Sequence, residues 1–174
     1  MLLRDDLLDR LDRLDEAASL VFDKGQHFRM VLVGGAALVL MEYTIRSTHD
    51  IDALEAPREL HSMMQEYDIN MQSRAYCDSF PYNYEDRLVL LEGVGGRRLY
   101  YYCMSLEDSI ISKLHRMGDN DTQDLTSDKI LGSINWTLLE QLKKEARMSA
   151  LSENSTSHKN FLHAYGNYVR EYRP

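Results

Sequence analysis

The chain reads VGGA at residues 33–36 and RSTHDID at residues 46–52, and these two stretches decide its fold. The first closes an apolar, partly β-branched run over residues 28–33, which predicts a buried strand. The diglycine ends that strand, and residues 36–43 are rich in helix-forming types, so we expect a helix to follow. Residues 47–54 then alternate polar and apolar side chains, which predicts a second, short strand.

Asp50 and Asp52 stand at positions i and i+2 of the second strand. Residues so spaced project to the same face, so we expect the two carboxylates side by side while Ile51 faces the core. Two like charges repel at this spacing unless a cation joins them, and Mg²⁺ is a natural partner for carboxylate oxygens. Such pairs serve phosphoryl and nucleotidyl transfer. An isolated Asp-x-Asp is, however, more often the polar side of a solvated strand.

Gly34 and Gly35 separate the first strand from its helix. Glycines let the backbone come close to a ligand, and the following helix contributes its positive N-terminal end. Together these features make an anion site suited to a phosphate. Taken alone, a diglycine turn is more often a structural connection.

The order of diglycine, helix and Asp-x-Asp strand resembles the nucleotidyltransferase superfamily, which has the DNA polymerase β-like fold. Residues 33–54 closely resemble bacterial nucleotidyltransferase-like proteins related to the AbiEii-type toxins of toxin–antitoxin systems. That family has a diglycine with a small residue and then an Arg-x-Thr-x-Asp-hydrophobic-Asp strand. The matching strand residues here are Arg46, Thr48, Asp50 and Asp52.

Two further elements carry the resemblance, which covers roughly residues 28–132. Residues 81–88, PYNYEDRL, are similar to a Pro-x-x-aromatic-x-x-Arg-Leu element of some members. Residues 105–125 look like a Glu-Asp-x-x-x-x-Lys-Leu-x-Arg helix followed by Asp-x-x-Asp. The residues that match this second pattern are Glu107, Asp108, Lys113, Leu114, Arg116, Asp121 and Asp124.

The resemblance implies an α/β (α+β) fold, in which helices flank a mixed sheet and a metal–nucleotide site lies at the sheet edge. Asp50 and Asp52 would be the catalytic residues and the ligands of Mg²⁺ or Mn²⁺. The implied nucleotide-binding residues are Gly34, Gly35, Arg46, Thr48, Lys113 and Arg116.

Several of these assignments have a structural alternative. Lys113 and Arg116 share a helix face at i and i+3, where they would meet either the triphosphate or only solvent. Arg46 would bind the nucleotide, or else pair with an aspartate or the helix face. Asp121 and Asp124 would instead cap and charge a helix N-terminus.

Active members of the superfamily usually carry a third carboxylate, which acts as general base or third metal ligand. Asp86 and Glu92, on either side of a predicted strand at residues 87–91, are the candidates, and Asp68 precedes another predicted strand at residues 69–73. The implied function is transfer of a nucleotidyl group from an NTP to a protein or RNA hydroxyl, in a toxin–antitoxin pair with a cognate antitoxin or other partner protein. The alternative is a catalytically degenerate member that acts as a nucleotide- or partner-binding regulatory module.

The bulk properties of the sequence set the broader frame. A soft boundary near Ser105 divides a nucleotidyltransferase-like α/β core with an N-terminal helix, residues 1–104, from a helical part, residues 105–174. The formal net charge of −8 argues against a broad DNA-binding surface, because phosphate-backbone binding relies on dense Lys and Arg. No apolar run approaches the roughly 18 residues of a membrane span. We therefore expect a cytoplasmic protein, with its two cysteines as reduced thiols.

Overall fold

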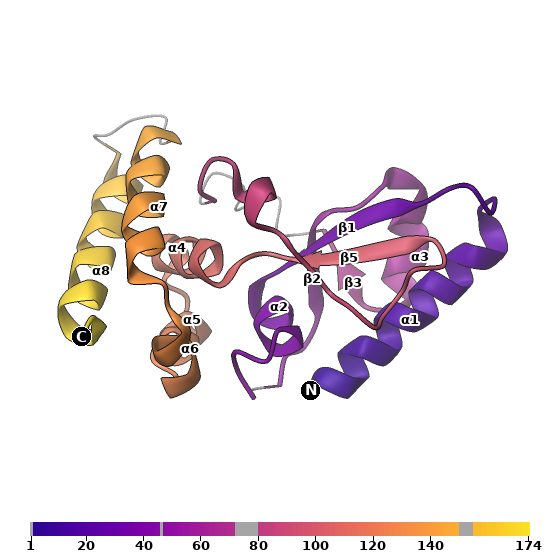
Figure 1. Ribbon diagram of the computed structural model, residues 1–174, viewed down its shortest axis with the longest axis horizontal. Coiled ribbons are helices and arrows are strands. Elements are labelled where there is room, and N and C mark those ends of the chain that lie inside the picture. The colour runs from indigo at the N-terminus through magenta and orange to yellow at the C-terminus, as the bar shows by residue number, and fades with distance from the viewer. Residues whose placement is uncertain (1, 46, 72–79, 150–154) are drawn as a thin grey trace. The chain divides into compact units, whose positions relative to one another are not determined.

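A computed structural model describes residues 2–45, 47–71, 80–149 and 155–174 (Figure 1). Five strands form one mixed sheet in the order β3-β2-β1-β5-β4. In this sheet β1 pairs antiparallel with β2 and parallel with β5. The mixed α/β fold predicted from the sequence is thereby confirmed. The strands are β1 (Phe28–Val33), β2 (Ile51–Glu55), β3 (Ile69–Asn70), β4 (Val89–Leu90) and β5 (Leu99–Cys103).

Helices occupy most of the remaining described residues, and none of these helices is both long and apolar enough to cross a membrane. Three accompany the sheet: α1 (Arg4–Val21), α2 (Gly34–Leu40) and α3 (His61–Glu66). Five follow it: α4 (Leu106–Arg116), α5 (Asp119–Leu125), α6 (Asp128–Ser133), α7 (Trp136–Ser149) and α8 (Thr156–Tyr172). Short 3₁₀ turns lie at η1 (Arg58–Leu60) and η3 (Tyr84–Arg87).

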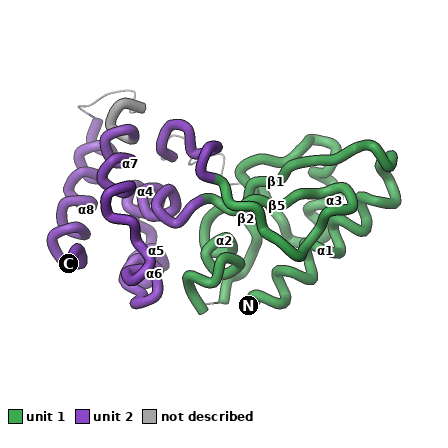
Figure 2. The backbone as a smooth tube through the Cα atoms, viewed as in Figure 1, with its two compact units in different colours: residues 1–75, 88–104 green, residues 76–87, 105–174 purple. Residues whose placement is uncertain are grey.

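The chain divides into two compact units (Figure 2). The sheet unit comprises the described residues within 1–75 and 88–104, and the helical unit those within 76–87 and 105–174. The chain passes from the sheet unit to the helical unit after residue 104, and the described part of 76–87 belongs with the helices. The division into residues 1–104 and 105–174 stays a prediction.

The core of the sheet unit lies between the sheet and helices α1, α2 and α3. The apolar side chains that α1 places at helical spacing are fully buried: Leu7, Leu11, Leu14 and Ala18. They belong to the same cluster as Met30 and Leu32 of β1 and Ile51 and Ala53 of β2. Alternate residues of the strands therefore face the helices, as the period-2 pattern predicts.

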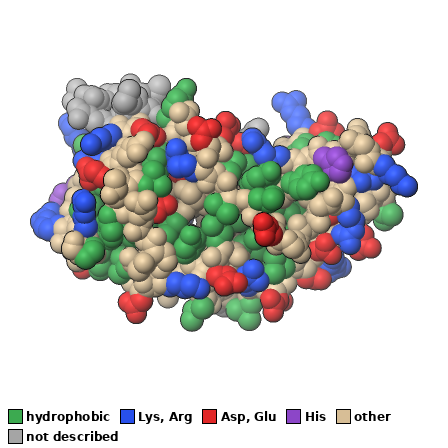
Figure 3. All heavy atoms as spheres, viewed as in Figure 1, with side chains coloured by type: hydrophobic (Ala, Val, Ile, Leu, Met, Phe, Trp, Pro, Cys, Tyr) green, Lys and Arg blue, Asp and Glu red, His purple; other side chains and the backbone are tan. Residues whose placement is uncertain are grey.

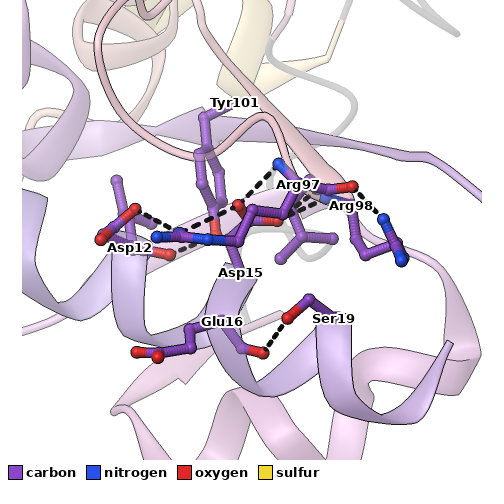
Figure 4. Close-up of polar contacts among 9 residues, drawn as sticks. Asp12, Asp15, Glu16, Ser19, Arg97, Arg98 and Tyr101 are labelled. Atoms are coloured by element: carbon purple, nitrogen blue, oxygen red, sulfur yellow. Dashed lines mark hydrogen bonds and ion pairs between the residues drawn. The ribbon is translucent and has the colours of Figure 1, made fainter. Parts of the chain in front are cut away.

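A buried carboxylate fastens α1 to the beginning of β5 (Figure 4). Asp15 Oδ1 accepts the backbone N–H groups of Arg98 and Leu99, both at 2.7 Å, and its Oδ2 accepts that of Arg97 at 2.9 Å. The Asp15 side chain is fully buried. Burying a charge is costly unless hydrogen bonds satisfy it, and three backbone donors do so here. Strand β5 begins at Leu99, the last of the three residues whose amides bind Asp15.

In the helical unit, a second buried carboxylate attaches the η3 segment to α4. Ser105 Oγ accepts the N–H of Asp108 at 3.1 Å and so caps the N-terminus of α4. The guanidinium of Arg87 donates to both Asp108 carboxylate oxygens at 2.8 Å. Asp108 is fully buried, and such two-pronged Arg–carboxylate pairs are strong and directional. This pair gives the physical reason why η3 belongs with the helices.

Helices α4 and α8 meet through aromatic rings. The His115 ring stacks on Phe161 with centroids 3.8 Å apart and planes 3° from parallel. His158, 3% exposed, lies beside Phe161, and neither of its ring nitrogens has a hydrogen-bond partner among the described residues. Burial, and secondarily the nearby His158, lower the pKa of His115 to about 4. The His115 imidazole therefore lies where a positive charge is unfavourable.

Replacing Asp15 tests the clamp between α1 and β5. Asp15→Asn keeps the shape but turns an amide N–H₂ toward backbone donors, so the free energy of unfolding should fall by about 2–4 kcal/mol. Asp12→Asn is the control, because its half-exposed ion pair with Arg97 is worth no more than about 1 kcal/mol. Urea denaturation measures both variants, and equal small losses would show that the buried bonds carry little stability.

Acid should destabilise the protein through His115. The folded pKa lies below the ordinary value, so the stability contribution is complete above about pH 6.5 and is lost as the pH falls toward 4. Between pH 7 and pH 5 we expect a loss of about 1–2 kcal/mol, allowing for partial exposure of the ring. His115→Phe keeps the stack and should remove this part of the acid sensitivity, whereas His163→Gln, at an exposed position, should leave it unchanged. Denaturation curves of the three proteins at pH 7 and pH 5 measure the loss of stability, and an equal loss in His115→Phe and wild type would contradict this role of His115.

Candidate functional site

The carboxylate pair lies where β2 begins. Asp52 pairs with Val33, the last residue of β1, and Asp50 immediately precedes β2. Ile51 is fully buried in the core, as predicted. Asp52 therefore projects from the opposite face of the sheet, where it is half-buried, while Asp50 is exposed.

The diglycine turn approaches this pair directly. Gly34 has φ +70°, a left-handed conformation that favours glycine. A Cβ atom built on Gly34 would lie 3.4 Å from Asp52 Oδ2. The backbone at the start of α2 and the Asp52 carboxylate are thus immediate neighbours, and the two motifs recognised in the sequence form one site.

Asn70, which the sequence analysis did not single out, completes the polar surroundings of the pair. Strand β3 runs parallel to β2 and pairs Asn70 with Asp52. The Asn70 side-chain amide donates from Nδ2 to Asp50 Oδ2 at 3.2 Å. A strand at residues 69–73 was predicted, but only the register across the sheet reveals which of its side chains meets the aspartates.

Thr48 shapes the turn that leads into the pair. Its hydroxyl donates to the backbone oxygen of Asp50 at 3.3 Å, and its own N–H and C=O pair with Leu2 at 3.0 and 2.7 Å. The side chain is 7% exposed. The predicted role of Thr48 at the nucleotide stays a prediction. Arg46, also predicted to bind the nucleotide, lies outside the described residues.

Lys113, Asp121 and Asp124 form a buried ion cluster in the helical unit. Lys113 Nζ donates to Asp121 Oδ1 at 2.9 Å and to Asp124 Oδ2 at 2.8 Å. Arg116 Nε adds a bond to Asp121 Oδ2 at 2.9 Å. The Lys113 side chain is only 5% exposed, so it is not part of a solvated helix edge. Asp121 Oδ2 also accepts the Gly118 N–H at 2.8 Å, the helix-start role considered for it.

Hydrogen bonds from neighbouring cations keep Asp121 ionised. Burial by itself opposes the charged form of Asp121, but the hydrogen bonds from Arg116 and Lys113 outweigh burial and lower the pKa of Asp121 to about 2. Positive and negative groups thus compensate one another within the helical unit. The predicted role of Lys113 and Arg116 at the triphosphate stays a prediction.

The two candidates for a third carboxylate lie in different places. Asp86 is an exposed residue of η3 in the helical unit. Glu92 follows β4, which pairs antiparallel with β5, so Glu92 lies toward the beginning of β1, whereas Asp52 pairs at its end. Within the described part of the chain, no three Asp, Glu, His or Cys side chains gather as a metal site. The third carboxylate therefore stays a prediction.

Two carboxylates beside a close backbone suit a particular kind of metal binding. Mg²⁺ usually keeps several waters and takes one or two carboxylates together with substrate phosphates. Asp50 and Asp52 are two such carboxylates, too few for an all-protein cage, and their role as metal ligands stays a prediction. Cys103 is not a competing nucleophile or ligand, because burial raises the pKa of its thiol to about 12. Cys77 lies outside the described residues.

The visible surface shows a mixed charge distribution. On the face drawn in Figure 3, Lys and Arg side chains lie interspersed with Asp and Glu. Dense runs of Lys and Arg are what backbone contacts to duplex DNA require. The mixed pattern on this face agrees with the acidic composition of the chain.

Comparison with known proteins adds one family match. A family model described as "Nucleotidyltransferase of unknown function (DUF6036)" matches residues 9–173. The match spans the diglycine turn, the carboxylate pair and the helical unit. Comparisons with curated proteins and with solved structures found no match.

Lys113 offers a test of the buried ion cluster. Lys113→Met leaves Asp121 and Asp124 without their shared cation, so the free energy of unfolding should drop by about 3–5 kcal/mol. Lys129→Met, at an exposed position of α6, should change it by no more than about 0.5 kcal/mol. Chemical denaturation of both variants gives the comparison. If Lys113→Met keeps its stability but loses NTP binding, Lys113 binds the nucleotide and does not stabilise the fold.

Proposed function

The chain belongs to the family of nucleotidyltransferases of unknown function (DUF6036), and from this premise we propose that it transfers a nucleotidyl group from an NTP to a hydroxyl of a protein or an RNA. The family membership agrees with the resemblance of the sequence to the nucleotidyltransferase superfamily. The relation to AbiEii-type toxins, and a place in a toxin–antitoxin pair, are part of the proposal.

The contact between Gly34 and Asp52 carries this proposal. A triphosphate needs backbone that approaches it closely, and its cation needs carboxylate oxygens. The chain brings the two together: a Cβ at Gly34 would stand 3.4 Å from Asp52 Oδ2, with Asp50 one residue before β2. We assign the β- and γ-phosphates to the Gly34–Gly35 backbone and the cation to Asp50 and Asp52. The cation would be Mg²⁺ or Mn²⁺.

The proposed reaction is a displacement at the α-phosphorus. The acceptor oxygen forms a bond to that phosphorus, the bond from the phosphorus to the β-bridging oxygen breaks, and pyrophosphate leaves. The hydroxyl proton passes to solvent water. A divalent cation, when bound, neutralises charge on the triphosphate. Thr48 helps to orient Asp50 by holding its backbone oxygen.

Isotope position gives a direct test of nucleotidyl transfer. Purified protein with Mg²⁺, total RNA or lysate protein, and NTP labelled on the α-phosphate should label an acceptor, whereas γ-labelled NTP should not. Asp50→Asn and Asp52→Asn should each reduce α-labelling by about 100-fold or more, because the cation loses a charged ligand.

Asp9→Asn is the matched control for this assay. Asp9 is an exposed carboxylate of α1 in a surface ion pair with Arg13, so its loss should leave labelling unchanged. Label transferred from the γ-phosphate would indicate phosphotransfer instead. Equal α-labelling by wild type and both site variants would contradict the proposal.

A second candidate function follows from the carboxylate count. Two acidic residues without a third described partner would also suit a degenerate member that binds a nucleotide or a partner protein without turnover. Such a regulatory module, for example one half of a toxin–antitoxin pair, should retain its partner in Asp50→Asn/Asp52→Asn. Loss of the partner in a pull-down with that double variant would count against it.

A further inference from the structure

We propose that Asn70 is a positioning residue that holds the Asp50 carboxylate and limits this site to a single divalent cation. The inference rests on the proposed function, which assigns the cation to Asp50 and Asp52. Asn70 pairs with Asp52 across β2 and β3, and its Nδ2 donates to Asp50 Oδ2 at 3.2 Å. One neutral side chain thus bonds the Asp50 carboxylate from the register position opposite Asp52.

The position of Asn70 is set by the surrounding fold. Its neighbour Ile69 is 1% exposed, pairs with Ile51 and belongs to the core. Arg10 Nη1 donates a hydrogen bond to the carboxylate of Asp68, the residue before Ile69, at 2.7 Å. Arg10 Nη1 also donates to the backbone oxygen of Tyr67 at 3.2 Å. Helix α1 and the core therefore fix β3, and side chains on rigid elements hold their partners accurately.

The chemistry of the amide decides how many cations the pair accepts. The Asn70 N–H₂ directs a donor at Asp50 Oδ2, which fixes the carboxylate and occupies one of its acceptor positions. A carboxylate at this register position would instead add a negative charge beside the first two. Two cations at one site need several anionic ligands to offset their mutual repulsion. An amide supplies none, so the pair suits one cation.

Substitution of Asn70 separates positioning from metal count. Asn70→Asp adds a third carboxylate and should raise the stoichiometry of bound Mn²⁺ from one to two per chain. Asn70→Ala releases Asp50 and should weaken the first Mn²⁺ by about tenfold, as losses of partners that orient metal ligands do. Electron paramagnetic resonance of free Mn²⁺ in titrations of the full chain, with a non-hydrolysable NTP present, measures both quantities. Asn160→Asp, exposed on α8, adds the same charge elsewhere and should bind like wild type.

The outcomes test the role of Asn70 separately from the proposed nucleotidyl transfer. Unchanged stoichiometry in Asn70→Asp, or an unchanged Mn²⁺ affinity in folded Asn70→Ala, would overturn the role of Asn70 even if wild type transfers nucleotides. No Mn²⁺ binding by wild type would overturn both proposals. The predicted Mn²⁺ shifts without any nucleotidyl transfer would support Asn70 and leave only the activity refuted. Circular dichroism confirms that each variant is folded, and Asn70→Ala remains informative if Asn70→Asp is not.

Discussion

Backbone hydrogen bonds between β1 and β2 set Val33 opposite Asp52, and the site follows from this register. Because β1 ends at Val33, the left-handed Gly34 turns the chain beside the Asp52 carboxylate. A slip of one residue would send Asp52 into the core and Ile51 outward, since neighbouring strand residues face opposite sides. The burial of Ile51 in the core thus helps to hold the carboxylates at the turn.

The sequence predicts elements well where one local signal dominates. The apolar run closed by a diglycine predicts β1 with its observed bounds. Elements shaped by distant contacts deviate from their predicted bounds. The strand predicted at residues 47–54 spans Ile51–Glu55, so Asp50 precedes it, and Thr48 pairs with Leu2 instead. The short α6 is not predicted, because one apolar turn leaves little periodicity.

The candidate site was predictable in its residue types but not in its neighbours. Asp50, Asp52 and the diglycine share a sequence pattern, so a resemblance finds them. Asn70 meets them only through the parallel pairing of β2 and β3, which no local pattern encodes. Conversely, Lys113 and Asp121 have the types expected around a triphosphate, yet they contact each other within the helical unit. Spacing in sequence cannot show whether a charge meets a ligand or an internal partner.

The passage of the chain between the units has a consequence for synthesis on the ribosome and for dissection into fragments. The chain leaves the sheet unit, contributes η3 to the helical unit, and returns with β4 and β5 before α4 begins. The hydrogen bonds that Asp15 of α1 accepts can therefore form only after residues 97–99 have been synthesised. A fragment cut after residue 104 would carry Arg87 without Asp108, so a cut between β5 and α4 would break the contact that attaches η3 to α4.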